Sequence, residues 1–472
     1  MSTREQREQL DALSREDLIA LVLQLQQRLA QLEARLNQNS HNSSKPPSQD
    51  SPFQPMAKQR SLTQRKSGGQ PGHEGKGLRK VEVPDQVVVH ARSTCQHCGY
   101  NLAQEPAQPA GAWQVFDLPA DLKLVVTQHQ RHKATCPWCR QESLAVLPDW
   151  LAEETPCQYG PRCRALGLYL MEQQHLPFER TQALFVDLFG SCPSAEATSG
   201  RRQGTLWNWQ QQAHHRLAPV EAAIAEALVA APIAGADETP VRGPHDLGWI
   251  HVLCNGAWTW YGAHAKRGRE AMDSFGLLER FTQAGGVLMS DCLASYAIYG
   301  KARALCNAHL LRELRAVEEA GHTWATSMAR LLLSVKERVE ACGAPLAGSA
   351  LLSVWRWFGR CLALGERENA AAFVDKSSCL LARLRTRRDE YLRFASVAGV
   401  WFDNNQSERA LRMVKLHQKV SGCFRSLLGA QVLCRVRGYL STMNKQGQGL
   451  FAALVSVMEG RPLLPPLMTQ NN

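Results

Sequence analysis

The chain has 472 residues, 44% of them hydrophobic and 21% charged, which excludes a wholly disordered protein and predicts several packed domains. Lys and Arg number 54 against 43 Asp and Glu, and this net charge of +11 favours nucleic acid as a partner over a merely basic protein. No signal peptide or apolar run of about 18 residues is visible, which predicts a protein without membrane contact. We expect it to be cytoplasmic and nucleoid-associated. In that reducing compartment its 15 cysteines are expected to be thiols or metal ligands.

The first predicted element is a helix within residues 1–40. Its apolar residues alternate steps of four and three, at Leu18, Val22, Leu25, Leu29, Leu32 and Leu36. This spacing favours a coiled coil through which the chain self-associates, and a single amphipathic helix packed on its own domain is the alternative. Residues 41–84 follow as a basic, flexible linker, which is either an arm that settles on phosphates or a solvated tether.

Two C-x-x-C pairs mark residues 85–148 as a zinc-ribbon domain. They are Cys95-Gln-His-Cys98 and Cys136-Pro-Trp-Cys139, and their four thiolates can surround Zn²⁺ as a tetrahedron. A strand-like run at residues 122–127 predicts an inserted β-hairpin between the pairs. His97 is not expected to bind the ion, and a chance pairing of unrelated cysteines is the alternative.

Residues 155–230 have a helical pattern. Apolar helices over residues 163–174 and 179–189 are separated at Leu176-Pro177, and a third helix is expected to begin near Ser199. This order is typical of helix-turn-helix proteins, so Arg201 and Arg202 on the third helix are candidate DNA contacts. Any small helical bundle has a similar pattern, and that interpretation stays open.

After residue 232 the pattern changes to that of a mixed sheet covered by helices. We expect, in order, three strands, a helix and a fourth strand, over residues 233–239, 249–254, 258–264, 269–283 and 287–291. Asp237 then lies in the middle of the first strand and Asp291 at the end of the last, where ligand sites of open α/β sheets gather. A carboxylate within an apolar strand needs a partner, a proton or a cation. Either acid alone could instead lie at an exposed strand edge or turn.

A third acid lies in the first turns of a helix that Asn404 or Asn405 can cap. This acid is Glu408, and Asp403 on the preceding loop competes with it for the same role. Basic residues follow on the helix, as a site that handles a phosphodiester needs. They are Arg409, Arg412, Lys415 and Lys419. Each of these cations, taken alone, could instead be an ordinary surface charge.

Several segments together resemble the transposases of the insertion sequence 66 family. In chain order they are Asn42-Ser-Ser-Lys-Pro-Pro-Ser48, Gly68-Gly-Gln-Pro-Gly-His73, Ala236-Asp-Glu-Thr-Pro240, Cys306-Asn-Ala-His309 with Leu311-Arg-Glu-Leu314, and Asp403-Asn-Asn-Gln-Ser-Glu-Arg409 with Lys419-Val-Ser-Gly-Cys-Phe-Arg-Ser426. The resemblance covers nearly the whole chain. It implies a multidomain α/β protein with a ribonuclease-H-like core over residues 231–314 and 399–430, a helical insertion over residues 315–398 and a C-terminal helical region over residues 431–472.

The resemblance also implies a transposase of the DDE type, in which Asp237, Asp291 and Glu408 form an acidic triad that holds Mg²⁺ or Mn²⁺. Two such ions can activate water or a DNA 3′-hydroxyl and steady the leaving oxygen. The expected function is to bind the ends of a bacterial insertion sequence and target DNA, to cleave strands and to transfer them, with accessory proteins of the element as further candidate partners. His309 has either a structural role or a place beside the scissile phosphate. The alternatives are an inactive zinc-containing DNA-binding regulator and a nuclease without strand transfer.

Overall fold

The computed structural model describes residues 79–104, 111–119, 121–194, 204–243, 247–300, 302–369 and 376–466, and in the N-terminal segment positions 14–16, 19, 22–24, 26, 28, 29 and 33. Nearly all of these N-terminal positions are helical, Val22 and Leu29 of the predicted seam among them. The other seam residues, Leu18, Leu25, Leu32 and Leu36, and the linker up to residue 78 lie outside the described residues. The chain divides into two compact units, Pro52–Thr127 and the remainder.

The two C-x-x-C pairs lie in short turns, one in each unit. An isolated bridge between Thr94 and Asn101 closes the first turn, and the antiparallel strands β1 (Lys133–Thr135) and β2 (Glu142–Leu144) flank the second. The run at residues 122–127, expected to be a strand, is in none. Its side chains Val125 and Val126 are 91% and 92% exposed, and no described segment pairs with this run.

A group of helices follows. It contains α3 (Pro161–Leu168), the π-helical turn η2 (Tyr169–Gln173), α4 (Phe178–Phe189), α5 (Thr205–Arg216) and α6 (Ala218–Val229). The predicted break before α4 is present, and α4 ends at Gly190 with φ +62°. The third helix begins at Thr205 in the described part of the chain. Arg201 and Arg202, the candidate DNA contacts, lie outside the described residues.

The centre of the larger unit is a five-stranded mixed sheet in the order β5-β4-β3-β6-β7. The strands are β3 (Ile233–Arg242), β4 (Leu247–Cys254), β5 (Thr259–His264), β6 (Val287–Ser290) and β7 (Arg303–Leu305). Neighbours among β3, β4 and β5 are antiparallel, whereas β6 runs parallel to β3 and β7 parallel to β6. This is the mixed sheet that the sequence predicts.

Helices cover both faces of this sheet. Because side chains alternate along a strand, Ala236 of β3 faces α7 (Arg269–Phe275), α8 (Leu277–Gln283) and the 3-10 helix η3 (Ala294–Ile298), whose apolar residues share its core. Val241 of the same strand faces α15 (Asn405–Ser421). The single helix expected over residues 269–283 is two helices, because Gly276 adopts φ +64° and ends α7.

The helices between the last strand and α15 share a core with one end of the sheet, which contributes Met289 of β6 and Leu305 of β7. They are α9 (Asn307–Glu319), α10 (Thr323–Cys342), α11 (Gly348–Glu368), α12 (Lys376–Thr386), α13 (Arg388–Tyr391) and α14 (Arg393–Ser396). Trp324 and Phe358 are fully buried there. The segment leaves and rejoins the sheet at one place, since the backbone N–H of Asn307 donates to the carbonyl of Phe402 over 3.1 Å.

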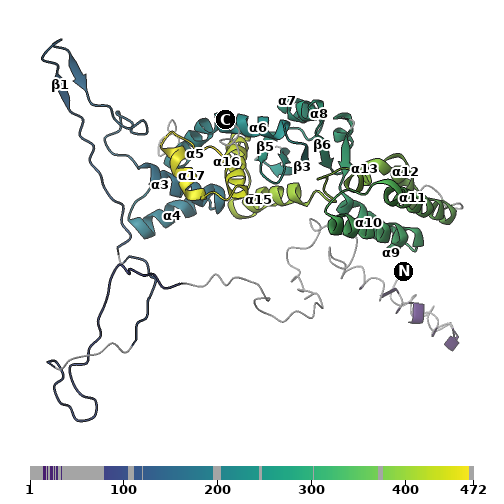
Figure 1. Cartoon of the computed structure of the whole chain (residues 1–472), viewed down its shortest axis with the longest axis horizontal. Coiled ribbons are helices and arrows are strands. Elements are labelled where there is room, and N and C mark those ends of the chain that lie inside the picture. Colours follow the sequence, from purple (N-terminus) through teal and green to yellow (C-terminus); the bar gives the residue numbers. More distant parts are fainter. Residues whose placement is uncertain are drawn as a thin grey trace. The chain divides into compact units, whose positions relative to one another are not determined.

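The two ends of the sheet are covered differently. The segment α9–α13 lies at the β7 edge, and α16 (Leu427–Lys445) with α17 (Leu450–Met458) lies with α3 and α5 at the β5 edge (Figure 1). A Cβ on Gly438 of α16 would lie 3.2 Å from the carbonyl oxygen of Thr259, so α16 packs closely on β5. None of the helices that the structure describes is both long enough and apolar enough to span a bilayer.

Candidate active site

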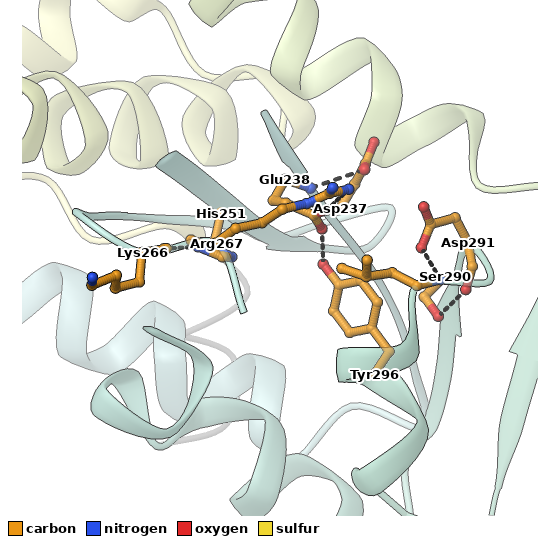
Figure 2. Close-up of polar contacts among 9 residues, drawn as sticks. Asp237, Glu238, His251, Lys266, Arg267, Ser290, Asp291 and Tyr296 are labelled. Carbon is orange, nitrogen blue, oxygen red and sulfur yellow. Dashed lines mark hydrogen bonds and ion pairs between the residues drawn. The ribbon is translucent and has the colours of Figure 1, made fainter. Parts of the chain in front are cut away.

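Asp237 and Asp291 lie at the same level of neighbouring parallel strands. The register of β3 and β6 aligns Gly235 with Met289. Continued by two residues, it sets Asp237 opposite Asp291, which directly follows β6. Adjacent strands are about 4.8 Å apart, and side chains at one level leave a parallel pair on the same face. The two acids therefore share one face of the sheet at the carboxyl end of β6 (Figure 2).

The start of α15 is fixed on that face of β3. The side-chain amide of Asn404 donates to the backbone carbonyl of Ala236 over 2.8 Å. Glycine permits the approach, because a Cβ on Gly235 would lie only 2.4 Å from Oδ1 of Asn404. Helix α15 thus begins beside the point from which Asp237 projects. Glu408 lies in the first turn of this helix, as the sequence predicts.

The charges of Asp291 and Glu408 act on the buried carboxyl of Asp237. Burial, the main cause, and the charges of the adjacent Glu238, of Asp291 and of Glu408 together raise the pKa of Asp237 to about 8. A backbone hydrogen bond from the N–H of Glu238 to Oδ1 of Asp237, 2.9 Å long, opposes the shift. A carboxylate removed from water and surrounded by like charges is stabilised by a cation. The arrangement therefore fits a divalent ion.

Glu238 adjoins Asp237 in sequence but faces the other side of the sheet. Its Oε1 accepts hydrogen bonds from Nε and Nη2 of Arg267 over 3.0 and 2.8 Å, and its Oε2 accepts one from the hydroxyl of Tyr296 over 2.6 Å (Figure 2). Tyr296 belongs to η3, which begins three residues after Asp291. Glu238 therefore ties the turn that bears Asp291 to β3. Sequence reasoning missed this residue, although the alternation of side chains along β3 separates it from Asp237.

A sulfur donor and a nitrogen donor lie beside the carboxylate of the third acid. The donor atoms of Cys306, His309 and Glu408 all lie within 4.8 Å of one another, and in the described part of the chain no other three His, Cys, Asp or Glu residues do so. Nδ1 of His309 is 3.6 Å, and Nη2 of Arg312 3.7 Å, from Oε1 of Glu408. Burial and the charge of Arg312 lower the pKa of His309, whereas the charges of Glu408 and Asp291 raise it. His309 therefore lies at the edge of the acidic site.

Asp403, the competing third acid, is engaged at the start of α15. Its Oδ1 accepts the backbone N–H of Asn405 over 3.1 Å. Its charge is not among those that shift the pKa of Asp237, whereas the charge of Glu408 is. Of these two acids, Glu408 is therefore the one whose charge acts on Asp237.

The predicted basic residues follow Glu408 along α15. Arg409, Arg412 and Lys419 are exposed, whereas Nζ of Lys415 donates to the backbone carbonyl of Pro240. Of the four cations, only Lys415 is thus bonded to β3, and the other three are accessible to a polyanion.

Each C-x-x-C pair lies in a turn of the same kind. The backbone N–H of Gly99 donates to the carbonyl of Cys95 over 2.9 Å, and that of Arg140 to the carbonyl of Cys136 over 2.8 Å. Gly99 and Arg140 both have left-handed backbones, with φ +74° and +58°. In each turn, backbone N–H groups near the first sulfur lower the pKa of Cys95 and of Cys136. Each turn by itself is therefore suited to offer two sulfurs to a metal ion. These are the sulfurs of Cys95 and Cys98 in the first turn and of Cys136 and Cys139 in the second.

Comparison with known proteins places these residues in a family. Residues 156–432 match the model of the transposase IS66 family. Residues 2–79 match the model of a family of unknown function, DUF6444. No curated protein matches the chain. The first match includes β3, β6, β7 and the start of α15, so it contains every residue of the acidic site described above.

Proposed function

Because the chain belongs to the transposase IS66 family, we propose that it cleaves and transfers DNA strands with a DDE-type site formed by Asp237, Asp291 and Glu408. The observation that carries the proposal is the meeting of three acids from two parallel strands and one helix. Their mutual charge shows in the pKa of Asp237, which lies at about 8. Such a cluster is costly unless a cation is bound, and a transposase of this type uses one.

The strand order supports a ribonuclease-H-like core over residues 231–314 and 399–430. Three antiparallel strands are followed by two parallel ones that extend the same edge of β3, as in that fold. Residues 315–398 would then be the helical insertion between the second and third acids. We further propose a zinc ribbon within residues 85–148 that uses Cys95, Cys98, Cys136 and Cys139, and a coiled-coil helix within residues 1–40 through which copies associate.

The donor set of the acidic site fits Mg²⁺ or Mn²⁺. Carboxylate oxygens are the hard ligands that these ions prefer. A site of this type would hold two ions about 3.5–4 Å apart, bridged by the carboxylates. When bound, the ions would supply an activated oxygen nucleophile and stabilise the leaving oxygen.

The remaining residues would hold DNA against the acids. Arg409, Arg412 and Lys419 lie on the exposed side of the helix that carries Glu408, so their charges extend along a path that a phosphate backbone can follow. The hydrogen bond from Tyr296 to Glu238 keeps the Asp291 turn in place while the substrate is bound.

The test supplies the full chain with Mg²⁺, a labelled duplex that carries an end of the element, and an unlabelled target duplex. We expect cleavage and joined products from the wild type. Asp291→Asn and Glu408→Gln should each lower cleavage by at least about 10²-fold while DNA binding is retained, and Asp403→Asn should leave cleavage nearly unchanged.

Cleavage by Glu408→Gln at the wild-type rate would overturn the assignment of the triad. Cleavage without joined products would identify a nuclease, and DNA binding without cleavage in the wild type would identify a regulator.

A further inference from the structure

Cys306, His309 and Glu408 come from three neighbouring places at the carboxyl end of β7. Cys306 is the N-cap of α9, and His309 lies one turn further on the same helix. Residues three apart in a helix share a side, so the sulfur and the imidazole face the same region. Glu408 enters that region from the first turn of α15.

The spacing of the three donor atoms is that of ligands to one ion. All three lie within 4.8 Å of one another, and Nδ1 of His309 is 3.6 Å from Oε1 of Glu408. A tetrahedral zinc ion has bonds of about 2.3 Å to sulfur and about 2.0–2.2 Å to nitrogen and oxygen, which separates its ligand atoms by about 3.3–3.6 Å. Small side-chain rotations would therefore complete the geometry.

Two of the three donor atoms have no hydrogen-bond partner. Nδ1 of His309 and Oε1 of Glu408 are both shielded from solvent, and neither takes part in a hydrogen bond. Buried polar atoms of this kind are uncommon in folded proteins and call for an explanation. Nη2 of Arg312 is 3.7 Å from the same oxygen, which is beyond hydrogen-bond distance. A bound cation would satisfy both atoms at once.

The sulfur lies among backbone donors, and the site is open on one side. Cys306 is 2% exposed, and its Sγ accepts the backbone N–H of Asn404 over 3.2 Å. Such outer hydrogen bonds orient a metal-binding thiolate and stabilise its charge. The side chain of His309 is 41% exposed, so an ion can enter from solvent past the imidazole.

We propose that Cys306, His309 and Glu408 bind one Zn²⁺ ion, with a fourth position left for water. One thiolate, one imidazole and one carboxylate form a ligand set that selects zinc over magnesium. This site is separate from the two C-x-x-C turns and goes beyond the proposed function. Because Glu408 is also the third acid of the proposed magnesium site, zinc here would compete for that carboxylate, a consequence that rests on the proposed function.

The experiment measures zinc bound per chain after the full protein has been dialysed against buffered Zn²⁺. Cys306→Ala and His309→Gln should each bind one zinc ion fewer than the wild type. Cys361→Ala is the matched control, because it removes another buried thiol, on α11, and it should bind as much zinc as the wild type. Circular dichroism checks folding, and His309→Gln, at a partly exposed position, keeps the test valid if Cys306→Ala unfolds.

Wild-type zinc content in folded His309→Gln would overturn the site, whatever the cleavage assay gives. The two proposals fail separately. Loss of cleavage in Glu408→Gln together with unchanged zinc content in His309→Gln would leave only the magnesium triad. Loss of one zinc ion in His309→Gln together with full cleavage by Asp291→Asn would leave only the zinc site.

Discussion

Replacing Asp237 with Asn is predicted to stabilise the metal-free protein while it ends DNA cleavage. Folding raises the pKa of this carboxyl from an ordinary value of 3.8 to about 8, chiefly because the group is buried. One pKa unit corresponds to about 1.4 kcal/mol, so the ionised side chain lowers the free energy of unfolding by up to about 6 kcal/mol above pH 8. Asn keeps the shape of the side chain and removes this charge.

The sign of the effect with pH follows from the protons bound in each state. Between about pH 4 and pH 8 the native protein retains a proton on Asp237 that the unfolded chain has lost. The free energy of unfolding of the wild type therefore falls as the pH rises through this window. The free energy of unfolding of Asp237→Asn should not show this decrease, because Asn does not ionise. The advantage of the variant should be near zero at about pH 4 and largest above about pH 8.

Urea unfolding, followed by tryptophan fluorescence at several pH values with and without Mg²⁺, measures this difference. Magnesium should raise the free energy of unfolding of the wild type at high pH and leave Asp237→Asn unchanged, because the ion binds the ionised acid. Asp187→Asn, an exposed position on α4, is the control. Equal stability of variant and wild type near pH 8, or a difference that does not change with pH, would refute the reasoning.

Two further predictions concern the helix that carries Glu408. Gly235→Ala would place a Cβ 2.4 Å from Oδ1 of Asn404, so thermal unfolding should show a loss of about 1–3 kcal/mol and cleavage should weaken, whereas Gly248→Ala, with its nearest contact at 3.4 Å, should change neither. If Gly235→Ala unfolds like the wild type, the close docking of α15 is wrong. Replacing Arg409 and Arg412 together with Ala should weaken DNA binding in anisotropy titrations and reduce the slope of log affinity against log salt by about 2; an unchanged slope would show that these arginines do not contact phosphates.

The sequence was sufficient to predict four of the five strands, all but β7, and the positions of the acids within their elements. Apolar runs and Gly turns mark the strands, so Asp237 within β3 and Asp291 at the end of β6 could be read directly. Their alignment across the two strands could not, because register depends on pairing between segments distant in the chain. The packing of α15 on β3 could not be predicted either, since a sequence does not show that Gly235 lies against the side chain of Asn404.

The groups around the acids were the hardest to predict. The C-x-x-H spacing of Cys306 and His309 is visible in the sequence, but the third donor, Glu408, lies in another helix. Glu238 was missed as a partner of Tyr296 because that contact depends on how η3 folds back after Asp291. Zinc binding by the two C-x-x-C pairs and the DNA contacts at Arg201 and Arg202 stay predictions.

The junction of Asn307 with Phe402 has a consequence for how such proteins can diverge. Nδ2 of Asn307 donates to the carbonyls of Tyr391 and Phe402 over 3.0 and 3.2 Å, and this clasp holds the exit and the return of the helical segment together. Closing a longer loop adds little entropic cost once its ends are fixed. Helices can therefore be added or lost beyond this clasp during evolution while the end of β7 and the start of α15 keep their spacing. The positions of the acids would then not change with the length of the helical segment.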